Sequence, residues 1–156
     1  LIEEIRSIMA ERVGIVADRH QATKLSPAIP KIGFVSPAQD FVNPDGVAIP
    51  KESMDLAARL CSMQKMHRAY MVTGGVCTGA ASKIEGTVVW QMLSEQARKK
   101  DVLNIGHPYG IMDVDIHLQH PASQGYDESY IESVGVGRTA RTILEGRVYV
   151  PAETFM

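Results

Sequence analysis

Eight consecutive residues near the middle of the chain, Gly74 to Ala81 (GGVCTGAA), carry no side chain larger than valine. A helix made of such residues can pack very close to a neighbouring element, because little side-chain volume separates the two backbones. Glycines on both sides of Cys77 also allow the backbone to turn sharply into a helix. We therefore expect a small-residue helix that begins near Cys77 and lies at the centre of the fold.

The start of this helix is open to three interpretations. Backbone N–H groups at a helix amino terminus are unpaired and carry partial positive charge, so Gly75, Val76, Thr78 and Gly79 are candidates for binding a carboxylate. The same field favours the thiolate of a cysteine, which makes Cys77 a candidate for proton transfer. Tight packing alone explains the same residues, because cysteine is among the most buried residue types.

Two further segments place polar groups next to expected turns. His67 and Arg68 lie ten and nine residues before Cys77, where a strand and a turn can fold them back towards the helix start. A histidine there can carry a proton near neutral pH, and an arginine can bind a carboxylate. Gly106 and His107 belong to GHPYG, whose glycines and proline predict a tight turn with N–H groups able to bind an anion. The alternatives are a hydrogen-bonded histidine, a solvated arginine and a plain turn.

The segment GRTAR near the end of the chain holds Arg138 and Arg141, three residues apart. On a helical turn these two side chains would share one face. They could hold a substrate that has several carboxylates, or they could face solvent.

The remaining pattern predicts an α+β domain. Helical spacing predicts amphipathic helices over residues 1–13 and 51–62 and another that begins at Gly86. Alternation and short apolar runs predict strands over 31–35, 69–72, 112–118 and 130–136, with a turn around 43–46. A helical turn over 137–144 and a last strand over 147–150 follow. We expect a mixed, mostly antiparallel sheet wrapped round the central apolar helix.

Composition limits the class of partner. Hydrophobic residues make up 45% of the chain and charged residues 22%, which is typical of a globular domain. The net charge of −2 argues against general binding to nucleic acid or to anionic membranes. No apolar run approaches the roughly 20 residues of a membrane span. Two cysteines and five scattered histidines suggest neither a disulfide framework nor a metal site, so we expect no metal and a cytoplasmic location.

The first residue, Leu1, already belongs to a helical pattern, without an initiator methionine or a signal peptide before it. We therefore expect residues 1–156 to be a single domain of a larger protein.

The chemistry-bearing segments, in this order, resemble the carboxy-terminal half of PrpF-type isomerases. The resemblance is carried by KMHRAYMVTGGVCTGAASKIEGT, then IGHPYG, then VGVGRTARTILEGRVYVP. The opening IEEIRSIMAERVGI and the later PKIGFVSP are also similar, so the resemblance covers nearly the whole chain.

This resemblance implies the diaminopimelate epimerase-like fold, in which two similar domains meet at an active-site cleft. It implies a cofactor-independent isomerase that moves a proton and a double bond in a small unsaturated di- or tricarboxylate, such as methylaconitate, methylitaconate or oxalomesaconate. The implied partners are the polycarboxylate substrate and the amino-terminal domain of the same protein. A homodimer is an alternative, since exposed apolar surface could drive self-association as easily as domain docking. In that family a lysine and a cysteine of the amino-terminal domain are the main proton-transfer pair. This half alone is therefore expected to be inactive, or nearly so.

The resemblance also ranks the candidate catalytic residues. Cys77, in VCTGA, stands where related epimerases have the cysteine of ACGSGA, and His67-Arg68 replaces their Glu-Arg pair, one residue further away. We expect His67 to be the functional side chain of this half, ahead of Cys77, with His107 third. One alternative is a stand-alone carboxylate- or protein-binding module, which a polar, self-contained surface would favour. Another is an amino-acid epimerase or racemase, against which His67 and VCTGA argue.

Overall fold

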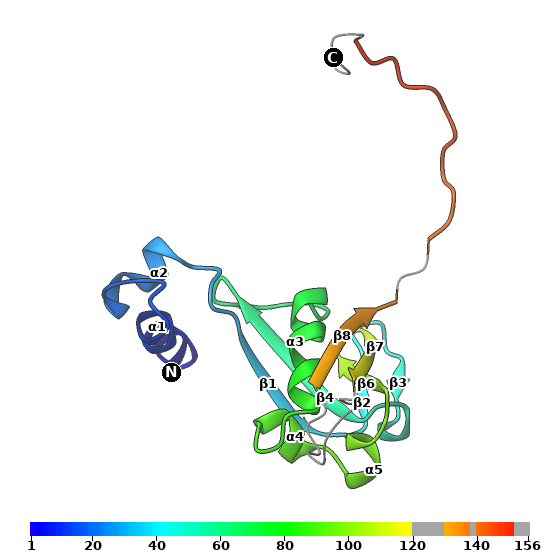
Figure 1. The fold of residues 1–156 in the computed structure, drawn as a ribbon, viewed down its shortest axis with the longest axis horizontal. Coiled ribbons are helices and arrows are strands. Elements are labelled where there is room, and N and C mark those ends of the chain that lie inside the picture. Colours follow the sequence, from blue (N-terminus) through cyan, green and yellow to red (C-terminus); the bar gives the residue numbers. More distant parts are fainter. Residues whose placement is uncertain (120–129, 138–139, 152–156) are drawn as a thin grey trace.

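A six-stranded sheet organises the chain, of which the computed structural model describes residues 1–119, 130–137 and 140–151. The strands follow the order β1-β4-β6-β7-β8, with β5 paired to β4 (Figure 1). Their bounds are β1 Ile32–Pro37, β4 Leu56–Ser62, β5 Lys65–Met66, β6 Val102–His107, β7 Gly110–Gln119 and β8 Tyr130–Val136. The β4–β6 pair is parallel and the other pairs are antiparallel, so the expected α+β class with a mixed, mostly antiparallel sheet is confirmed.

Strand β4 lies where the sequence predicts a helix over residues 51–62, and that prediction is wrong. A single 3-10 turn, η2 (Lys51–Ser53), precedes β4, which lies between β1 and β6 in the sheet. Five of its seven residues are buried, because both faces of the strand are covered. A strand buried on both faces loses the alternation that identifies a half-exposed strand, so its short apolar run resembles a buried helix.

The core lies between the sheet and helix α3 (Val72–Ser82). Alternate residues of the central strands are buried there: Leu56, Ala58, Leu60, Leu103, Ile105, Val114 and Ile116. The alternation predicted along 112–118 is confirmed by β7, and the strand predicted over 130–136 coincides with β8. Burial of each large aliphatic side chain contributes about 1.5–3 kcal/mol, so this layer supplies much of the stability of the domain.

Two short helices follow α3 where the sequence predicts one. Helix α4 (Val88–Met92) is capped at its amino end by Thr87, whose hydroxyl accepts the backbone N–H of Trp90. Helix α5 (Glu95–Arg98) is capped in the same way by Ser94, whose hydroxyl accepts the N–H of Ala97. The second N-cap starts a new helix and so interrupts the expected continuous one.

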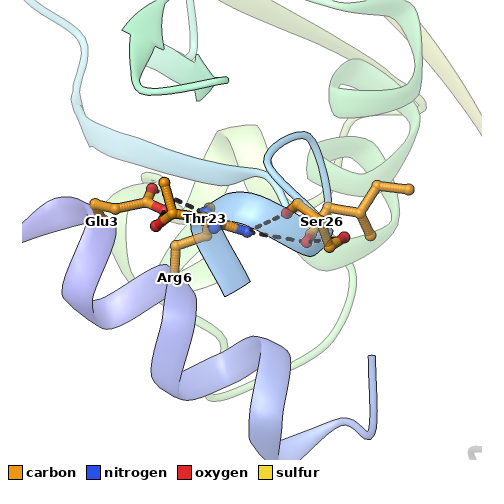
Figure 2. A network of polar contacts seen from close by, with 5 residues as sticks. Glu3, Arg6, Thr23 and Ser26 are labelled. Carbon is orange, nitrogen blue, oxygen red and sulfur yellow. Dashed lines mark hydrogen bonds and ion pairs between the residues drawn. The ribbon is translucent and has the colours of Figure 1, made fainter. Parts of the chain in front are cut away.

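A polar network fastens the amino-terminal helix α1 (Ile2–Arg12), which confirms the helix predicted over residues 1–13, to the chain that follows it. The buried guanidinium of Arg6 binds both carboxylate oxygens of Glu3 and donates to the carbonyls of Ser26 and Ile29, at 2.8 and 2.9 Å (Figure 2). The Thr23 hydroxyl, from α2 (Ala22–Leu25), donates to the same carboxylate at 2.7 Å. Hydrogen bonding to Arg6 lowers the pKa of Glu3. This contribution to stability is therefore lost as pH falls through that lowered pKa.

Helix α1, the 3-10 turn η1 (Arg19–Gln21) and α2 form a small unit that stands away from the sheet (Figure 1). Its own buried cluster consists of Ala10, Val16 and Ala22. Much of the apolar face of α1 stays exposed instead, at Ile2, Ile5 and Met9, each more than 40% accessible. The unit thus buries a few small apolar side chains and leaves several of its larger apolar ones uncovered.

The end of the chain differs from its prediction. The sequence predicts a helical turn over 137–144 and a strand over 147–150, but the described residues 140–151 form neither. They extend away from the sheet (Figure 1), and Ile143, Leu144, Val148 and Tyr149 are at least 85% exposed. A strand forms only when its backbone groups pair with a neighbour, and no pairing partner lies beside this segment among the described residues.

The predicted turn around 43–46 is confirmed in a small hairpin of β2 (Phe41–Val42) and β3 (Ala48–Ile49). The side-chain oxygen of Asn43 accepts the N–H groups of Asp45 and Val47, as an asparagine at a turn commonly does. Phe41 of this hairpin lies against Arg59 of β4, with 5.2 Å between the guanidinium carbon and the ring centre.

Candidate functional site

Helix α3 begins five residues earlier than expected. The predicted strand over 69–72 is wrong: residues 67–71 cross from the sheet to the helix, and Val72 is the first helical residue. The N–H of Gly75 already donates to the carbonyl of Met71 at 2.8 Å. The crossing is held by Tyr70, a buried side chain whose hydroxyl lies 2.9 Å from that of Thr78. This apolar segment can leave the sheet because the Tyr70 side chain is buried against α3 and not in the sheet.

The unpaired N–H groups at the start of α3 therefore belong to Val72, Thr73 and Gly74. The sequence assigns them to Gly75–Thr78, and that assignment is wrong, because those residues and Gly79 lie inside the helix. Cys77 is likewise in the middle of α3 and not at its amino end.

Three of the candidate glycines have a packing role in this structure. A Cβ added at Gly75 would lie 2.7 Å from the sulfur of Met112, and one at Gly79 would lie 2.6 Å from Val114 Cγ1. A Cβ at Gly106 would collide with the sulfur of Met54. The packing interpretation of these glycines thus has direct support, since no side chain fits at their positions without a shift of a neighbour.

The two candidate histidines lie at strand ends that face each other along one edge of β4. Strand β5 and strand β6 both pair with this edge, and a gap separates them. At one side of the gap the N–H of His67 donates to the carbonyl of Leu60 at 2.7 Å. At the other side, β6 pairs Ile105 with Leu56 and Gly106 with Ala57. The same register, continued by one residue, places His107 beside Ala58.

Residues that lie beside each other on neighbouring strands share one face of the sheet. Ala58 and Leu60 face the core, so His107 beside Ala58 and His67 beside Leu60 are on the α3 face. Two residues along a strand span about 7 Å, which sets the scale of the gap.

Both histidines are held in the same way. The Nδ1 atom of His67 accepts the backbone N–H of Ala69 at 3.2 Å, and the Nδ1 atom of His107 accepts that of Tyr109 at 3.3 Å. A ring nitrogen that accepts a hydrogen bond carries no proton, so in the neutral ring the proton is on Nε2. Each histidine therefore offers an Nε2–H donor, which suits a carboxylate.

Arg59 is the residue at the gap that sequence reasoning missed. It stands between Ala58 and Leu60 on β4, and its Nη1 donates to the carbonyls of Ala58 and Gly106 at 2.8 and 3.3 Å. An arginine inside the apolar run LAARLCS is a signal in itself, since a charged side chain in a buried strand needs partners. The helix predicted over residues 51–62 would place Arg59 on its solvent-facing side, so this signal was not used.

Arg59 places a positive charge near His107. Burial lowers the pKa of His107, and the nearby charges of Arg59 and His67 lower it further. His107 is therefore mostly neutral at pH 7, as an Nε2–H donor beside a permanent cation. Arg68 is exposed in a separate hollow with His67, Met63 and Met66.

Cys77 is not brought together with the histidines. It is exposed and lines a hollow of about 780 Å³ between α3, β1 and α4, with Lys31, Phe34 and Val88. His107 lines another hollow, of about 700 Å³, with Asp113 and Asp115. Tyr70 lines both hollows.

The other candidate anion-binding groups are scattered. Arg141 is exposed on the extended end of the chain, and Arg138 lies outside the described residues. Within residues 1–119, 130–137 and 140–151, no three acidic, histidine or cysteine side chains group as metal ligands would. Nor does any helix of those residues have the length and apolar character needed to cross a bilayer.

The comparisons with known proteins agree on one family. Residues 1–151 match the family described as PrpF protein. The 3-methylitaconate isomerase of Eubacterium barkeri is 37% identical over 150 residues, which are 96% of this chain and 37% of that protein. The 2-methyl-aconitate isomerase of Shewanella oneidensis is 34% identical over 149 residues, 96% of this chain and 36% of that protein.

A solved structure agrees with these sequences. The crystal structure of a methylitaconate-delta-isomerase superposes with a TM-score of 0.71 and 31% identity, covering 87% of this chain and 36% of that one. This chain therefore spans little more than a third of the length of the curated relatives it matches. Sequence and fold lead to the same conclusion: the chain belongs to the PrpF family.

Proposed function

We propose that this chain forms one wall of the active site of a cofactor-independent isomerase of small unsaturated di- or tricarboxylates, such as methylaconitate or methylitaconate. The observation that carries the proposal is the gap along the edge of β4, where His67 and His107 each offer an Nε2–H donor on the α3 face and Arg59 places a positive charge behind them. A substrate with two or three carboxylates needs such donors and positive charge. Relatives with isomerase names support the reaction class.

The proposed reaction is an allylic proton shift. A base removes a proton from the carbon next to the conjugated double bond, and the electron pair moves into the system conjugated with the carboxylate. The double bond shifts by one position and a proton returns to the far allylic carbon, so atoms and electrons balance without an oxidant. Hydrogen-bond donors aimed at the enolate-like intermediate lower the barrier.

The candidate residues have different proposed parts in this reaction. His67 is the proposed catalytic side chain, and its position across the gap makes His107 a better partner for it than Cys77. Cys77 lines a different hollow from either histidine, so it ranks behind His67 as the proposed proton-transfer group. Arg68 and the free N–H groups of Val72 to Gly74 are proposed carboxylate partners.

We propose further that this chain is the carboxy-terminal half of its protein and that an amino-terminal domain completes the cleft. Some of the exposed apolar residues lie on two projecting segments, at Ile2, Ile5 and Met9 of α1 and within residues 143–150. Exposed apolar patches of this kind usually lie at interfaces, which favours a docked domain over a self-contained binding module. In water each polar contact of the open wall is worth far less than in a closed cleft, so the chain alone should have almost no activity.

The test is an isomerase assay by proton NMR in D₂O, with 2-methyl-cis-aconitate and 2-methylene-3-methylsuccinate as substrates. The protein is assayed as this chain and with an amino-terminal domain attached. We expect turnover only in the longer form, and a loss of about 100-fold or more in kcat/KM for His67→Gln. His20→Gln is the matched control, because His20 is an exposed histidine on η1.

Absence of turnover of either acid by the longer protein would refute the reaction class. Full activity of this chain alone would refute the two-domain part. If the longer protein binds these acids in calorimetry without isomerising them, a carboxylate-binding module is the better description.

A further inference from the structure

We infer that Arg59 is a positioning residue: held between the ring of Phe41 and the carbonyl of Gly106, it fixes the end of β6 so that His107 presents its Nε2–H at the gap. The part of this inference that concerns a substrate carboxylate rests on the proposed function. The part that concerns Arg59 and His107 rests on the geometry alone.

The first support is the gap itself. Strand β4 has no strand partner on this edge between the last pair with β6, Ala57 and Gly106, and the first pair with β5, Cys61 and Met66. A carbonyl left without a donor in such a place costs stability. Arg59 donates Nη1 to the carbonyl of Gly106 as well as to that of Ala58, so it joins the two strands where backbone pairing stops.

The second support is the way in which Arg59 is held. Residues 58 and 60 face the core, so residue 59 leaves the sheet on the opposite face. There the Phe41 ring lies 5.2 Å from the guanidinium carbon, within the range of a cation–π contact. Arg59 therefore acts from behind the gap, where it does not compete with a ligand on the α3 face.

The third support concerns His107. Its Nδ1 is already used by the N–H of Tyr109, so a second proton on the ring would break that bond. The positive charge of Arg59 behind the gap also disfavours this second proton, since like charges disfavour the charged form of histidine. Other titratable groups also surround His107: His67 from the end of β5, Tyr70 before α3, Tyr109 in the turn, and Asp113 and Asp115 on β7.

The two aspartates would favour protonation of His107. Even so, the pKa of His107 is lowered, with burial as the first cause, Arg59 as the second and His67 as the third. The neutral ring is thus the form that the folded chain favours. The free energy of unfolding should therefore fall as the pH drops below about 6.5, the usual histidine pKa, because the folded chain disfavours the protonated ring of His107.

The test is an NMR titration of the His107 ring in this chain, which needs no catalytic activity. Arg59→Gln removes the charge but keeps an N–H donor for the carbonyls, and we expect the pKa of His107 to rise by about half a unit or more. Arg59→Lys restores a charge and should bring the pKa back towards that of the unmodified chain. Arg98→Gln is the matched control, because Arg98 lies over Trp90 at 3.6 Å in α5, another cation–π pair.

An unchanged His107 titration in a folded Arg59→Gln chain would overturn the inference, as would an equal shift in Arg98→Gln. If Arg59→Gln does not fold, Phe41→Leu takes its place: we expect a smaller rise of the same sign, and no rise would overturn the inference.

Kinetics of the longer protein add a separate readout. There Arg59→Gln should raise KM by about tenfold, with a smaller change in kcat, because a weakened carboxylate contact acts first on binding. A protein without isomerase activity would refute the proposed function while leaving the titration to decide the role of Arg59.

Discussion

The two faces of helix α3 are built from the same small residues but meet different surroundings. Towards β7 and β8, Gly79 leaves no room for a side chain, since an added Cβ would lie 2.6 Å from Val114 and 3.0 Å from Val134. Towards β1 and α4, Cys77 is exposed and lines a wide hollow. The difference shows that small residues serve packing on one face, while on the other they leave space that this chain does not fill.

Gly79→Ala is the substitution with the largest expected effect on this comparison. The new methyl group would collide with two valine side chains, and overpacking of this kind costs about 1–3 kcal/mol. The better helix propensity of alanine, about 0.5–1 kcal/mol, offsets only part of that cost. We expect a net loss of about 1–2 kcal/mol in the free energy of unfolding, measured by urea denaturation.

Gly74→Ala is its matched control on the same helix. A Cβ there would meet Leu60 and Tyr70 at 3.4 and 3.5 Å, which is ordinary or nearly ordinary contact. Its stability should stay unchanged or rise slightly. Equal losses in the free energy of unfolding for Gly79→Ala and Gly74→Ala would show that crowding on the β7 and β8 side does not cause the loss.

Thr78→Val tests the boundary between the two faces. Thr78 and Tyr70 are both buried, and their hydroxyl groups pair at 2.9 Å. Valine keeps the volume but leaves the tyrosine hydroxyl without its partner, which costs about 1–2 kcal/mol. Thr78→Ser keeps the hydroxyl and should lose less. If both variants unfold at the same urea concentration, the hydrogen bond contributes nothing measurable.

Cys77→Ala has the smallest expected effect, because the open face gives the thiol few contacts to lose. We expect a change within about 0.5 kcal/mol in the free energy of unfolding. In the same preparation, iodoacetamide should label Cys77 well before Cys61, which is buried on β4. A stability loss as large as that of Gly79→Ala would mean that the hollow is filled in solution.

Some residues of the candidate site follow from sequence patterns, and one depends on tertiary contacts. His67, Arg68 and His107 were named from the sequence because turn residues and titratable side chains coincide there. Arg59 was missed because its partners, the carbonyl of Gly106 and the ring of Phe41, are 47 and 18 residues away in the sequence. The place of Arg59 in the apolar run LAARLCS signals that it needs a partner, but nothing local identifies that partner. The assignment of these residues to catalysis or binding stays a prediction.

Local patterns predicted the elements that depend on local chemistry. The helix at residues 1–13, the strands β1, β7 and β8, and the turn at Asn43 follow from periodicity and from turn residues. The segments resembling PrpF proteins led to the family that the comparisons confirm.

Tertiary structure alone decided the rest. Residues 56–62 form a strand because β1 and β6 pair with both of its edges, although the run by itself fits a helix equally well. Helix α3 starts at Val72 because Tyr70 is buried beneath it, and residues 147–150 form no strand because nothing described lies beside them to pair with. In each case the deciding free energy comes from partners distant in the sequence, and a local pattern carries no information about them.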